Sequence, residues 1–311
     1  VEYEDHTSPS IYVKFPILAT RGELSQRGWP LPKDVNQVAI VIWTTTPWTL
    51  PSNQAVAINP DFVYALVRAG ETAYVIADKL VDSFANACGI TNAQVFFRDV
   101  GGRLFPKSVA TYCQRPFGTE MSPVLDGDFV TLDQGTGCVH IAPDHGQEDD
   151  FLRRKHNASA EALGRKKIEF LSLVDNRGRF TDEVPEFQGL KVFEANPRIN
   201  EKLKERGLLL GEGKLDHSYP HCWRCKHPVI FRATDQWFVS METNELRKKA
   251  LEEIDRVRWI PPRGRERIYG MIEGRPDWCL SRQRVWGVPI PGFSCRKCGD
   301  VLFSAELVEH V

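Results

Sequence analysis

The chain has 311 residues, and its 40 Lys and Arg residues against 41 Asp and Glu residues give a formal net charge of -1 at pH 7. This balance excludes a general attraction for nucleic acid, so any RNA contact must depend on local basic clusters. No apolar run approaches the roughly 20 residues of a membrane-spanning helix. We therefore expect a cytoplasmic protein with no membrane partner and with about two domains.

The first part of the chain predicts a mainly β structure, because apolar and β-branched runs alternate with Gly, Pro, Asn and Asp turns. The expected strands are 11–15, 38–43, 63–67, 73–76 and 129–132. The expected helices are 78–87, 147–155 and 196–206, the last with Pro197 near its start and Gly207 as its C-cap.

The pattern changes from about Asp216. An amphipathic helix is expected at 242–257, ending before Pro261 and Pro262, and a shorter one at 265–272, interrupted by Gly270. We therefore divide the chain into domains 1–215 and 216–311.

A hydroxyl-rich turn follows the run 38–43. The segment TTTPWTLPSN, from Thr44 to Asn53, presents four threonines, and Pro47 and Pro51 restrict its backbone. The sequence predicts that a strand delivers this stiff polar turn.

A second polar stretch, GTGCVHIAPDHGQEDD, runs from Gly135 to Asp150. Behind a Gly-Thr-Gly turn it supplies two imidazoles, His140 and His145, and four carboxylates. Together the two stretches predict a small polar pocket.

Both stretches resemble signature motifs of the editing domain of the isoleucyl-tRNA synthetase family. The opening VEYEDHTSPSIYVKFP, HSYPHCWRCKHPVIFRATDQWFVSM from His217 and DWCLSRQRVWGVPIP from Asp277 resemble the same family, so the likeness covers nearly the whole chain. The related valine and leucine enzymes usually carry an arginine and an acidic residue around the motif proline, where this chain has Thr46 and Trp48. The resemblance is therefore specific to the isoleucine enzyme.

The resemblance implies an α+β fold: a mainly β-barrel-like editing domain with peripheral helices, followed by a smaller mixed α/β connective region. It implies hydrolysis of mischarged valyl-tRNA(Ile), with the tRNA(Ile) acceptor end and the remainder of the synthetase as partners. No cofactor is required for that hydrolysis. HIGH-type and KMSKS-type motifs and an initiator Met do not occur in the sequence. We therefore expect an internal fragment that does not bind ATP or adenylate by itself.

In the implied site Asp149 binds the substrate ammonium, and His140 limits the size of the amino acid. Thr45 and Thr46 contact the terminal adenosine and the ester, with Thr44 in support. A helix N-terminal acid, a hydrogen-bonded structural histidine and plain turn hydroxyls are the respective alternatives.

Three further residues are substrate-binding candidates. Asn53 matches the family motif, and Trp48 and Tyr219 are candidate pocket walls. An ordinary turn amide and core aromatics are the alternatives. No protein nucleophile is evident, which favours direct attack by water.

Charged residues close to Asp149 in the sequence are expected to influence the site. Asp144 stands where the family commonly has glycine, and we expect it to raise the pKa of Asp149 by like-charge repulsion. Glu148 and Asp150 fit the role of helix N-terminal acids. The basic clusters 153–155 and 165–167 predict either RNA contact or a solvated charged surface.

Two knuckle-like pairs, Cys222-x-x-Cys225 and Cys295-x-x-Cys298, would together supply four thiolates to a structural zinc ion. Alternatively, each pair completes a site with residues outside this chain, or the thiols stay reduced and metal-free. The remaining cysteines are expected to be buried thiols: Cys88, Cys113, Cys138 and Cys279.

A function of another class stays open. The same basic clusters and knuckles would suit a non-catalytic tRNA-binding or zinc-ribbon scaffold. A stand-alone deacylase that edits in trans is a third hypothesis.

Overall fold

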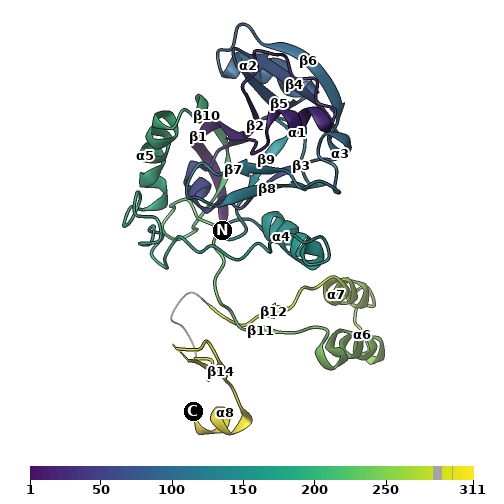
Figure 1. Ribbon diagram of the computed structural model, residues 1–311. Helices are drawn as coiled ribbons and strands as arrows, with labels where there is room; N and C mark the ends of the chain where they lie inside the picture. Colours follow the sequence, from purple (N-terminus) through teal and green to yellow (C-terminus); the bar gives the residue numbers. More distant parts are fainter. Residues whose placement is uncertain (283–288, 296) are drawn as a thin grey trace. The chain divides into compact units, whose positions relative to one another are not determined.

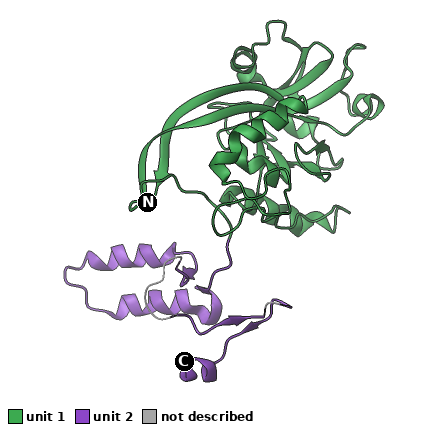
Figure 2. Cartoon of the chain, turned by 90° about the vertical axis from the view of Figure 1, so that its left-hand side faces the viewer, with its two compact units in different colours: residues 1–233 green, residues 234–311 purple. Residues whose placement is uncertain are grey.

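The computed structural model describes residues 1–282, 289–295 and 297–311 (Figure 1). It divides into two compact units, Val1–Ala233 and Thr234–Val311 (Figure 2). The boundary expected after residue 215 falls inside strand β10 (Leu209–His221), which pairs with β1 (Glu2–Pro16) over most of its length. A boundary there would cut through this ladder, so the first unit continues to Ala233.

A six-stranded sheet forms the larger part of the first unit, in the order β10-β1-β2-β5-β4-β6. Its remaining strands are β2 (Gln37–Thr44), β5 (Thr72–Ala77), β4 (Val63–Ala69) and β6 (Gln94–Val100). Strands β2 and β5 pair in parallel, and the other neighbours are antiparallel. The central strand β2 is buried on both faces, which explains its continuous apolar run. Four of the five expected strands are confirmed here.

A second sheet has four strands in the order β7-β8-β3-β9. They are β7 (Tyr112–Gln114), β8 (Met121–Asp126), β3 (Ala55–Ile58) and β9 (Cys138–Ile141). The α+β class is confirmed, but within the described residues neither the six-stranded nor the four-stranded sheet closes into a barrel, so the expected barrel-like form is only a loose description.

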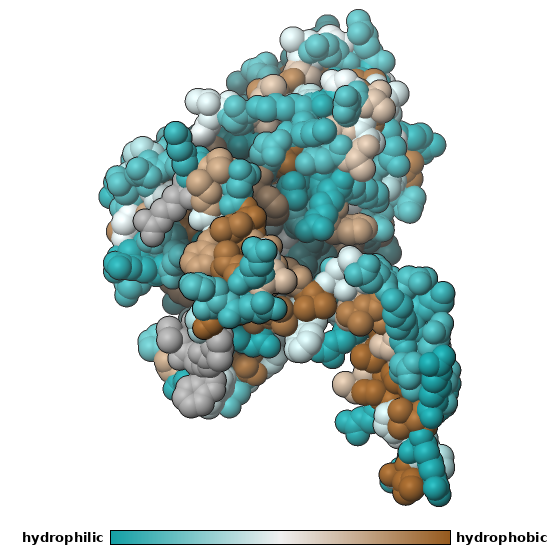
Figure 3. Space-filling model, turned by 90° about the horizontal axis from the view of Figure 1, so that it is seen from below, coloured by the Kyte–Doolittle hydropathy of each residue, from teal (hydrophilic) through white to brown (hydrophobic). Residues whose placement is uncertain are grey.

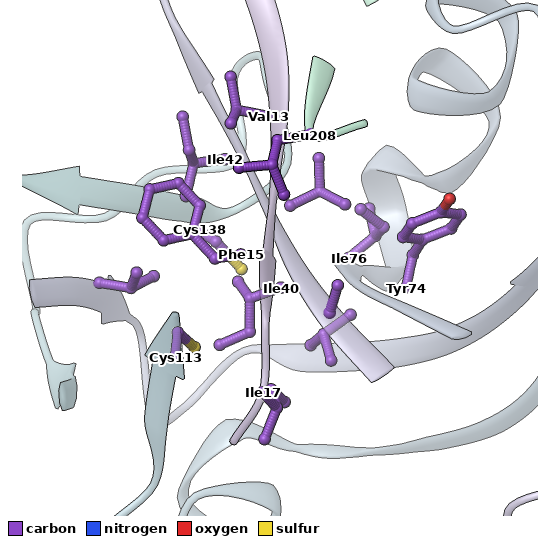
Figure 4. Packing of buried hydrophobic residues seen from close by; sticks show 14 of the residues in the cluster. Val13, Phe15, Ile17, Ile40, Ile42, Tyr74, Ile76, Cys113, Cys138 and Leu208 are labelled. Carbon is purple, nitrogen blue, oxygen red and sulfur yellow. The ribbon is translucent and has the colours of Figure 1, made fainter. Parts of the chain in front are cut away.

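The main core lies against the six-stranded sheet (Figure 4). Val13 and Phe15 of β1 and Ile40 and Ile42 of β2 are fully buried there. Each such side chain contributes roughly 1.5–3 kcal/mol to folding. The thiols of Cys113 and Cys138 lie in the same core, where burial raises their pKa. The expectation of buried thiols is confirmed for these two cysteines, whereas Cys88 and Cys279 are half-buried.

The helices of the first unit are α1 (Arg21–Gln26), α2 (Val81–Ala87), α3 (Gly101–Leu104), α4 (Gln147–Ala160) and α5 (Val192–Glu205), with short 3-10 turns η1 (Pro47–Ser52) and η2 (Asp78–Leu80). Two expected helices are confirmed by η2 with α2 and by α4. Helix α5 begins earlier than expected, so Pro197 lies inside it and removes one helical hydrogen bond.

The strand expected at 129–132 is wrong. The amide of Val130 donates to the carbonyl of Gly127 at 3.4 Å, which closes a turn. Its apolar side chain belongs to a second, smaller core instead. Burial alone produced the strand-like pattern.

The second unit contains η3 (Thr243–Glu245), α6 (Leu246–Arg256), α7 (Gly264–Glu273) and α8 (Ala305–His310). Two short ladders join β11 (Phe238–Val239) to β12 (Trp278–Cys279) and β13 (Phe293–Ser294) to β14 (Val301–Leu302). Both expected helices are confirmed, with Gly270 inside α7. Part of the motif from Asp277 lies outside the described residues.

Apolar side chains remain on the surface of the molecule (Figure 3). In the second unit Trp278, Phe293, Leu302 and Phe303 are each at least half exposed. No helix in the described part of the chain is long and apolar enough to cross a membrane.

Candidate active site

Strand pairing brings the two polar stretches together. The first stretch runs from the end of β2 through η1 into β3, and β3 pairs antiparallel with β9, with Val56 opposite His140. The amide of Gln54 also donates to the carbonyl of Ile141 at 2.8 Å. The end of η1 therefore lies beside the end of β9, where the second stretch continues.

The threonines of the turn form a chain of hydrogen bonds. The amide of Thr46 donates to Thr44 Oγ1 at 3.1 Å, and the two hydroxyls lie 3.2 Å apart. Thr46 Oγ1 also lies 3.4 Å from Thr49 Oγ1. Thr45 is half-buried, and its hydroxyl makes no hydrogen bond to the described residues.

The turn reaches the second stretch through Thr49 and His140, whose Oγ1 and Nε2 lie 2.9 Å apart. Thr49 donates its one hydroxyl hydrogen to the carbonyl of Thr46 at 2.9 Å, so the imidazole Nε2–H is the donor to Thr49. Burial, with a smaller effect of His145, lowers the pKa of His140 to about 4 and keeps the ring neutral. Its Nδ1 is buried and has no partner among the described residues.

Asp149 lies in the first turn of α4. Its Oδ2 accepts a hydrogen bond from the amide of Ala142 at 2.7 Å, which closes the loop between β9 and α4. The backbone of Gly146 passes so close that a Cβ there would lie 2.8 Å from Asp149 Cγ. The sequence at 146 therefore leaves room for the carboxylate.

Burial raises the pKa of Asp149 to about 6, against the opposing effect of the Ala142 hydrogen bond. The like charge that adds to this increase is Glu148 rather than Asp144. Asp144 interacts with Arg232 and Ser172, and burial raises its own pKa. The expected increase at Asp149 is present, but its assignment to Asp144 was wrong.

Trp48 and Asn53 are buried side chains of the first stretch. Trp48 is 2 % exposed and packs edge-on against His145, with ring centroids 4.7 Å apart. Asn53 is fully buried, donates from Nδ2 to the carbonyl of Ala55 at 2.8 Å and accepts from Ser122 Oγ. Both polar ends of this amide are engaged, so Asn53 supports the start of β3.

Tyr219 belongs to a different cluster, on the β1–β10 ladder. Its ring lies 5.2 Å from that of His6, 5.6 Å from that of His217 and 6.1 Å from that of His221. Its hydroxyl donates to the carbonyl of Val229 at 3.0 Å. These contacts do not bring Tyr219 to the threonine turn.

Sequence reasoning assigned no role to Thr49, Ser52 or His145. His145 Nε2 lies 3.1 Å from Ser52 Oγ, and its Nδ1 lies 3.0 Å from the carbonyl of Phe231. Hydroxyls and an imidazole within the two motifs were the available signal. Their pairing depends on the β3–β9 register, which local sequence does not reveal.

Most cations of the two basic clusters are already engaged. Asp150 pairs with Arg153 at 2.8 Å and with Arg154 at 2.7 Å. In the second cluster Lys166 pairs with Glu120 and Lys167 with Glu161. Such pairs fit a solvated charged surface, which was one of the two alternatives.

The two cysteine pairs share one backbone pattern. In each, the residue after the second cysteine has a positive φ, 57° for Lys226 and 77° for Gly299. Its amide donates to the carbonyl of the first cysteine, at 2.8 Å to Cys222 and 2.9 Å to Cys295. The same backbone hydrogen bond therefore closes both turns.

The amides of Lys297 and Cys298 lower the pKa of Cys295, which favours the thiolate that a metal requires. No group of three or more metal-binding side chains is assembled within the described ranges. Cys222 and Cys225 lie in the first unit, and Cys295 and Cys298 in the second. The chemistry of each pair fits two ligands of a zinc site.

A family model described as tRNA synthetases class I (I, L, M and V) matches residues 1–311. The chain belongs to this class I tRNA synthetase family. An isoleucine–tRNA ligase of Geobacter sulfurreducens is 50% identical over 314 residues, covering 100% of this chain and 32% of the relative. That of Nitratidesulfovibrio vulgaris (strain Miyazaki F) is 53% identical over 312 residues, covering 100% of this chain and 31% of the relative. This class I synthetase chain thus spans about a third of the length of the curated relatives it matches.

Solved structures agree with the fold. The editing domain of the P. knowlesi cytosolic leucyl-tRNA synthetase aligns with a TM-score of 0.51 at 12% identity, over 68% of this chain and 96% of that chain. The P. falciparum domain, with deletions of two insertions, gives 0.52 at 12% identity, over 66% of this chain and 99% of that chain. The class I synthetase chain therefore has the fold of these editing domains.

Proposed function

We propose that this chain is the editing part of an isoleucyl-tRNA synthetase and that it hydrolyses the ester of valine mischarged on tRNA(Ile). The bond between Thr49 and His140 carries the proposal, because it joins the two motif stretches into one site. The match to isoleucine–tRNA ligases at about half identity supports the choice of amino acid.

A second selection step is chemically reasonable. A pocket discriminates by only about 1–3 kcal/mol over one methylene, for which valine and isoleucine in isoleucyl-tRNA synthetase are the standard example. An editing site must admit valine, exclude isoleucine and direct a water to the ester carbonyl. His140, rigid and neutral, is suited to limit the size of the side chain.

Asp149 holds the ammonium of the bound amino acid. Its Oδ2 is engaged by Ala142, which leaves Oδ1 for the ligand. At pH 7 the carboxylate is largely ionised, because its pKa is about 6. A charge-assisted hydrogen bond of this kind contributes roughly 1.5–3 kcal/mol.

The threonine turn contacts the terminal adenosine and the ester. The free hydroxyl of Thr45 is the direct contact, while Thr44 and Thr46 fix the turn through their mutual bonds. Water is the nucleophile. Trp48 and Asn53 act from within the wall, and Tyr219 contacts substrate only if the acceptor end extends to the β1–β10 ladder.

The partners are the acceptor end of tRNA(Ile) and the remainder of the synthetase. The exposed apolar side chains of the second unit, including Phe293 and Leu302, support its packing against that remainder. A role in translation places the protein in the cytoplasm.

Zinc is a structural partner of the two knuckles. We infer that each pair supplies two thiolates to a tetrahedral site, since both have the same closed turn and Cys295 favours the thiolate. Two arrangements satisfy this: one ion shared by both pairs, or one ion per pair with further ligands outside the chain.

The test is deacylation of tRNA(Ile) carrying radiolabelled valine, with the chain and with Asp149→Asn. We expect ester loss with the wild-type chain and none above background with the variant. Tight tRNA binding by both proteins without ester loss would favour the scaffold alternative.

A further inference from the structure

His145 links three segments that are distant in sequence. Its Nε2 lies 3.1 Å from Ser52 Oγ at the end of η1, and its Nδ1 lies 3.0 Å from the carbonyl of Phe231. Its ring packs edge-on against Trp48, also in η1, with centroids 4.7 Å apart. One imidazole thus touches the threonine-bearing turn twice.

The direction of these bonds is determined. A carbonyl oxygen only accepts, so His145 Nδ1 carries the hydrogen and donates to Phe231. Burial lowers the pKa of His145 to about 4, which keeps the ring neutral. Nε2 therefore has a lone pair and accepts the hydroxyl hydrogen of Ser52.

This pair does not form a nucleophile and its base. Ser52 is 1 % exposed, so its hydroxyl is closed to an ester substrate. The third group is a backbone carbonyl, where a catalytic triad has a carboxylate. The arrangement serves to hold one segment against another.

Hydrogen bonds to other parts of the first unit hold the segment 229–233 in place. The amide of Val229 donates to the carbonyl of Pro220 in β10 at 3.0 Å, and that of Ala233 donates to the carbonyl of Asp144 at 2.7 Å. Arg232 Nη1 donates to the carbonyl of Val174 at 3.1 Å. Because His145 bonds to both Phe231 and Ser52, it holds the end of η1 against this segment.

We propose that His145 is a positioning residue that fixes η1, and with it the threonine hydroxyls, by joining Ser52 to the segment 229–233. The inference rests on the proposed ester hydrolysis only for its kinetic consequence. Thr44, Thr45 and Thr46 stand immediately before η1, so release of its far end moves their hydroxyls, including the proposed ligand contact at Thr45. Misplacement by about 1 Å costs on the order of 100-fold in rate.

Two amide substitutions separate the contacts of the ring. His145→Gln places an amide oxygen near the position of Nε2, which keeps an acceptor for Ser52 but loses the bond to Phe231. His145→Asn places its amide near Nδ1, which keeps the bond to Phe231 but loses Ser52. Ser52→Ala removes the same contact from the other side, and His156→Asn is the matched control. His156 is another buried histidine bonded to a backbone carbonyl, that of Lys166, away from the turn.

The experiment measures hydrogen exchange at the amides of Thr49 and Asn53, which close η1, together with kcat and KM for valyl-tRNA(Ile) hydrolysis by the full chain. We expect His145→Asn and Ser52→Ala each to raise exchange at these amides about tenfold or more. In both variants kcat falls about 10- to 100-fold with KM changed less than about threefold. His145→Gln, which breaks the link at Phe231, raises exchange and lowers kcat in the same direction, whereas His156→Asn stays close to wild type in both measurements.

The double variant His145→Asn with Ser52→Ala tests the link itself, because two ends of one contact are not additive. Its kcat should match that of either single variant. Equal exchange in wild type and His145→Asn, or wild-type exchange and kcat in His145→Gln, would overturn the proposal. If the wild-type chain showed no hydrolysis, the proposed function would be wrong. The positioning role of His145 would still be tested, because the exchange comparison measures the position of η1 without hydrolysis.

Discussion

Thr49 Oγ1 and His140 Nε2 lie 2.9 Å apart although 91 positions separate them in the chain. The bond is buried. Because Thr49 donates its hydroxyl hydrogen to the carbonyl of Thr46, His140 Nε2–H must be the donor to Thr49. The bond therefore fixes both the orientation of the imidazole and its tautomer. The size limit that we assign to His140 depends on this fixed ring.

Thr49→Val should destabilise the fold by about 1–3 kcal/mol, because the buried Nε2–H of His140 loses its acceptor. Thr49→Ser keeps the hydroxyl and should cost less. Urea unfolding of the two variants measures the difference. Equal losses would instead assign the effect to packing of the threonine methyl group.

Hydrolysis should decrease as the pH falls through about 6, the pKa of Asp149. The ammonium requires the ionised carboxylate, so activity is present above this pKa and lost below it. His140 and His145, with pKa values near 4, titrate below this range. Initial rates across pH 4.5–8 should therefore follow one group, as about a tenfold loss per pH unit below the pKa.

Glu148→Gln should shift this acid limb to lower pH, because removal of a neighbouring negative charge lowers the pKa of Asp149. Asp144→Asn, the matched control, should leave the limb in place. A shift with Asp144→Asn and none with Glu148→Gln would show that the charge on Asp144 controls the site.

Asp149→Asn should stabilise the fold at neutral pH while it abolishes hydrolysis. The folded-state pKa of Asp149 is raised, so the native state binds the proton more tightly than the unfolded chain does. The unfolding free energy of the wild type therefore decreases as the pH rises from about 4 to about 6. Asparagine does not ionise, so the variant does not lose this stability. Because asparagine still accepts from Ala142, we expect a gain on the order of 2 kcal/mol at pH 7 and little at pH 4. A variant less stable than wild type at pH 7 would contradict the assigned burial cost.

Local pattern was sufficient for much of the fold. The apolar run 38–43 predicted β2, and the helix expected at 147–155, with Glu148 and Asp150 as N-terminal acids, is α4. It failed where tertiary burial produced the same pattern as a strand, at Val130, and where packing extended α5 past Pro197. The division at Ala233 follows from the pairing of β1 with β10, which depends on residues far apart in sequence.

The sequence predicted which residue types belong to the candidate site better than it predicted their positions and contacts. His140 bonds to the threonine turn through Thr49, and Asp149 bonds to the amide of Ala142, two residues after His140. The positions of Asn53 and Tyr219 could not be foreseen, since an amide or a phenol has the same identity whether it lines a pocket or bonds to backbone. The role of His145 also depends on the carbonyl of Phe231, which lies outside the two polar stretches.

Gly146→Ala should impair the site, because its Cβ would lie 2.8 Å from Asp149 Cγ. We expect KM for the valyl ester to rise about tenfold and stability to fall by about 1–3 kcal/mol. Gly22→Ala in α1 is the control, since the nearest atom to its Cβ is 3.9 Å away. Steady-state kinetics and thermal unfolding distinguish the two, and an unchanged KM in Gly146→Ala would argue against Asp149 as the ammonium ligand.

Zinc content should discriminate the two knuckle arrangements. A single shared site predicts one zinc per chain, with complete loss in either Cys222→Ser or Cys295→Ser. Separate half-sites predict that each variant loses only the metal at its own pair. Elemental analysis after extensive dialysis measures both, and absence of zinc from the wild type prepared in zinc-containing medium would exclude the proposal.

The comparison of valyl-tRNA(Ile) with isoleucyl-tRNA(Ile) tests the central claim most directly. Ester loss is followed for both substrates with the wild-type chain and with His140→Ala. We predict that the wild type hydrolyses the valyl ester faster, and that His140→Ala gains isoleucyl hydrolysis while it retains valyl hydrolysis, because the size limit is removed. Equal rates for the two esters in the wild type would contradict the editing assignment. A collapse of both rates by roughly 10²–10⁴-fold in His140→Ala would instead make His140 a proton-transfer residue.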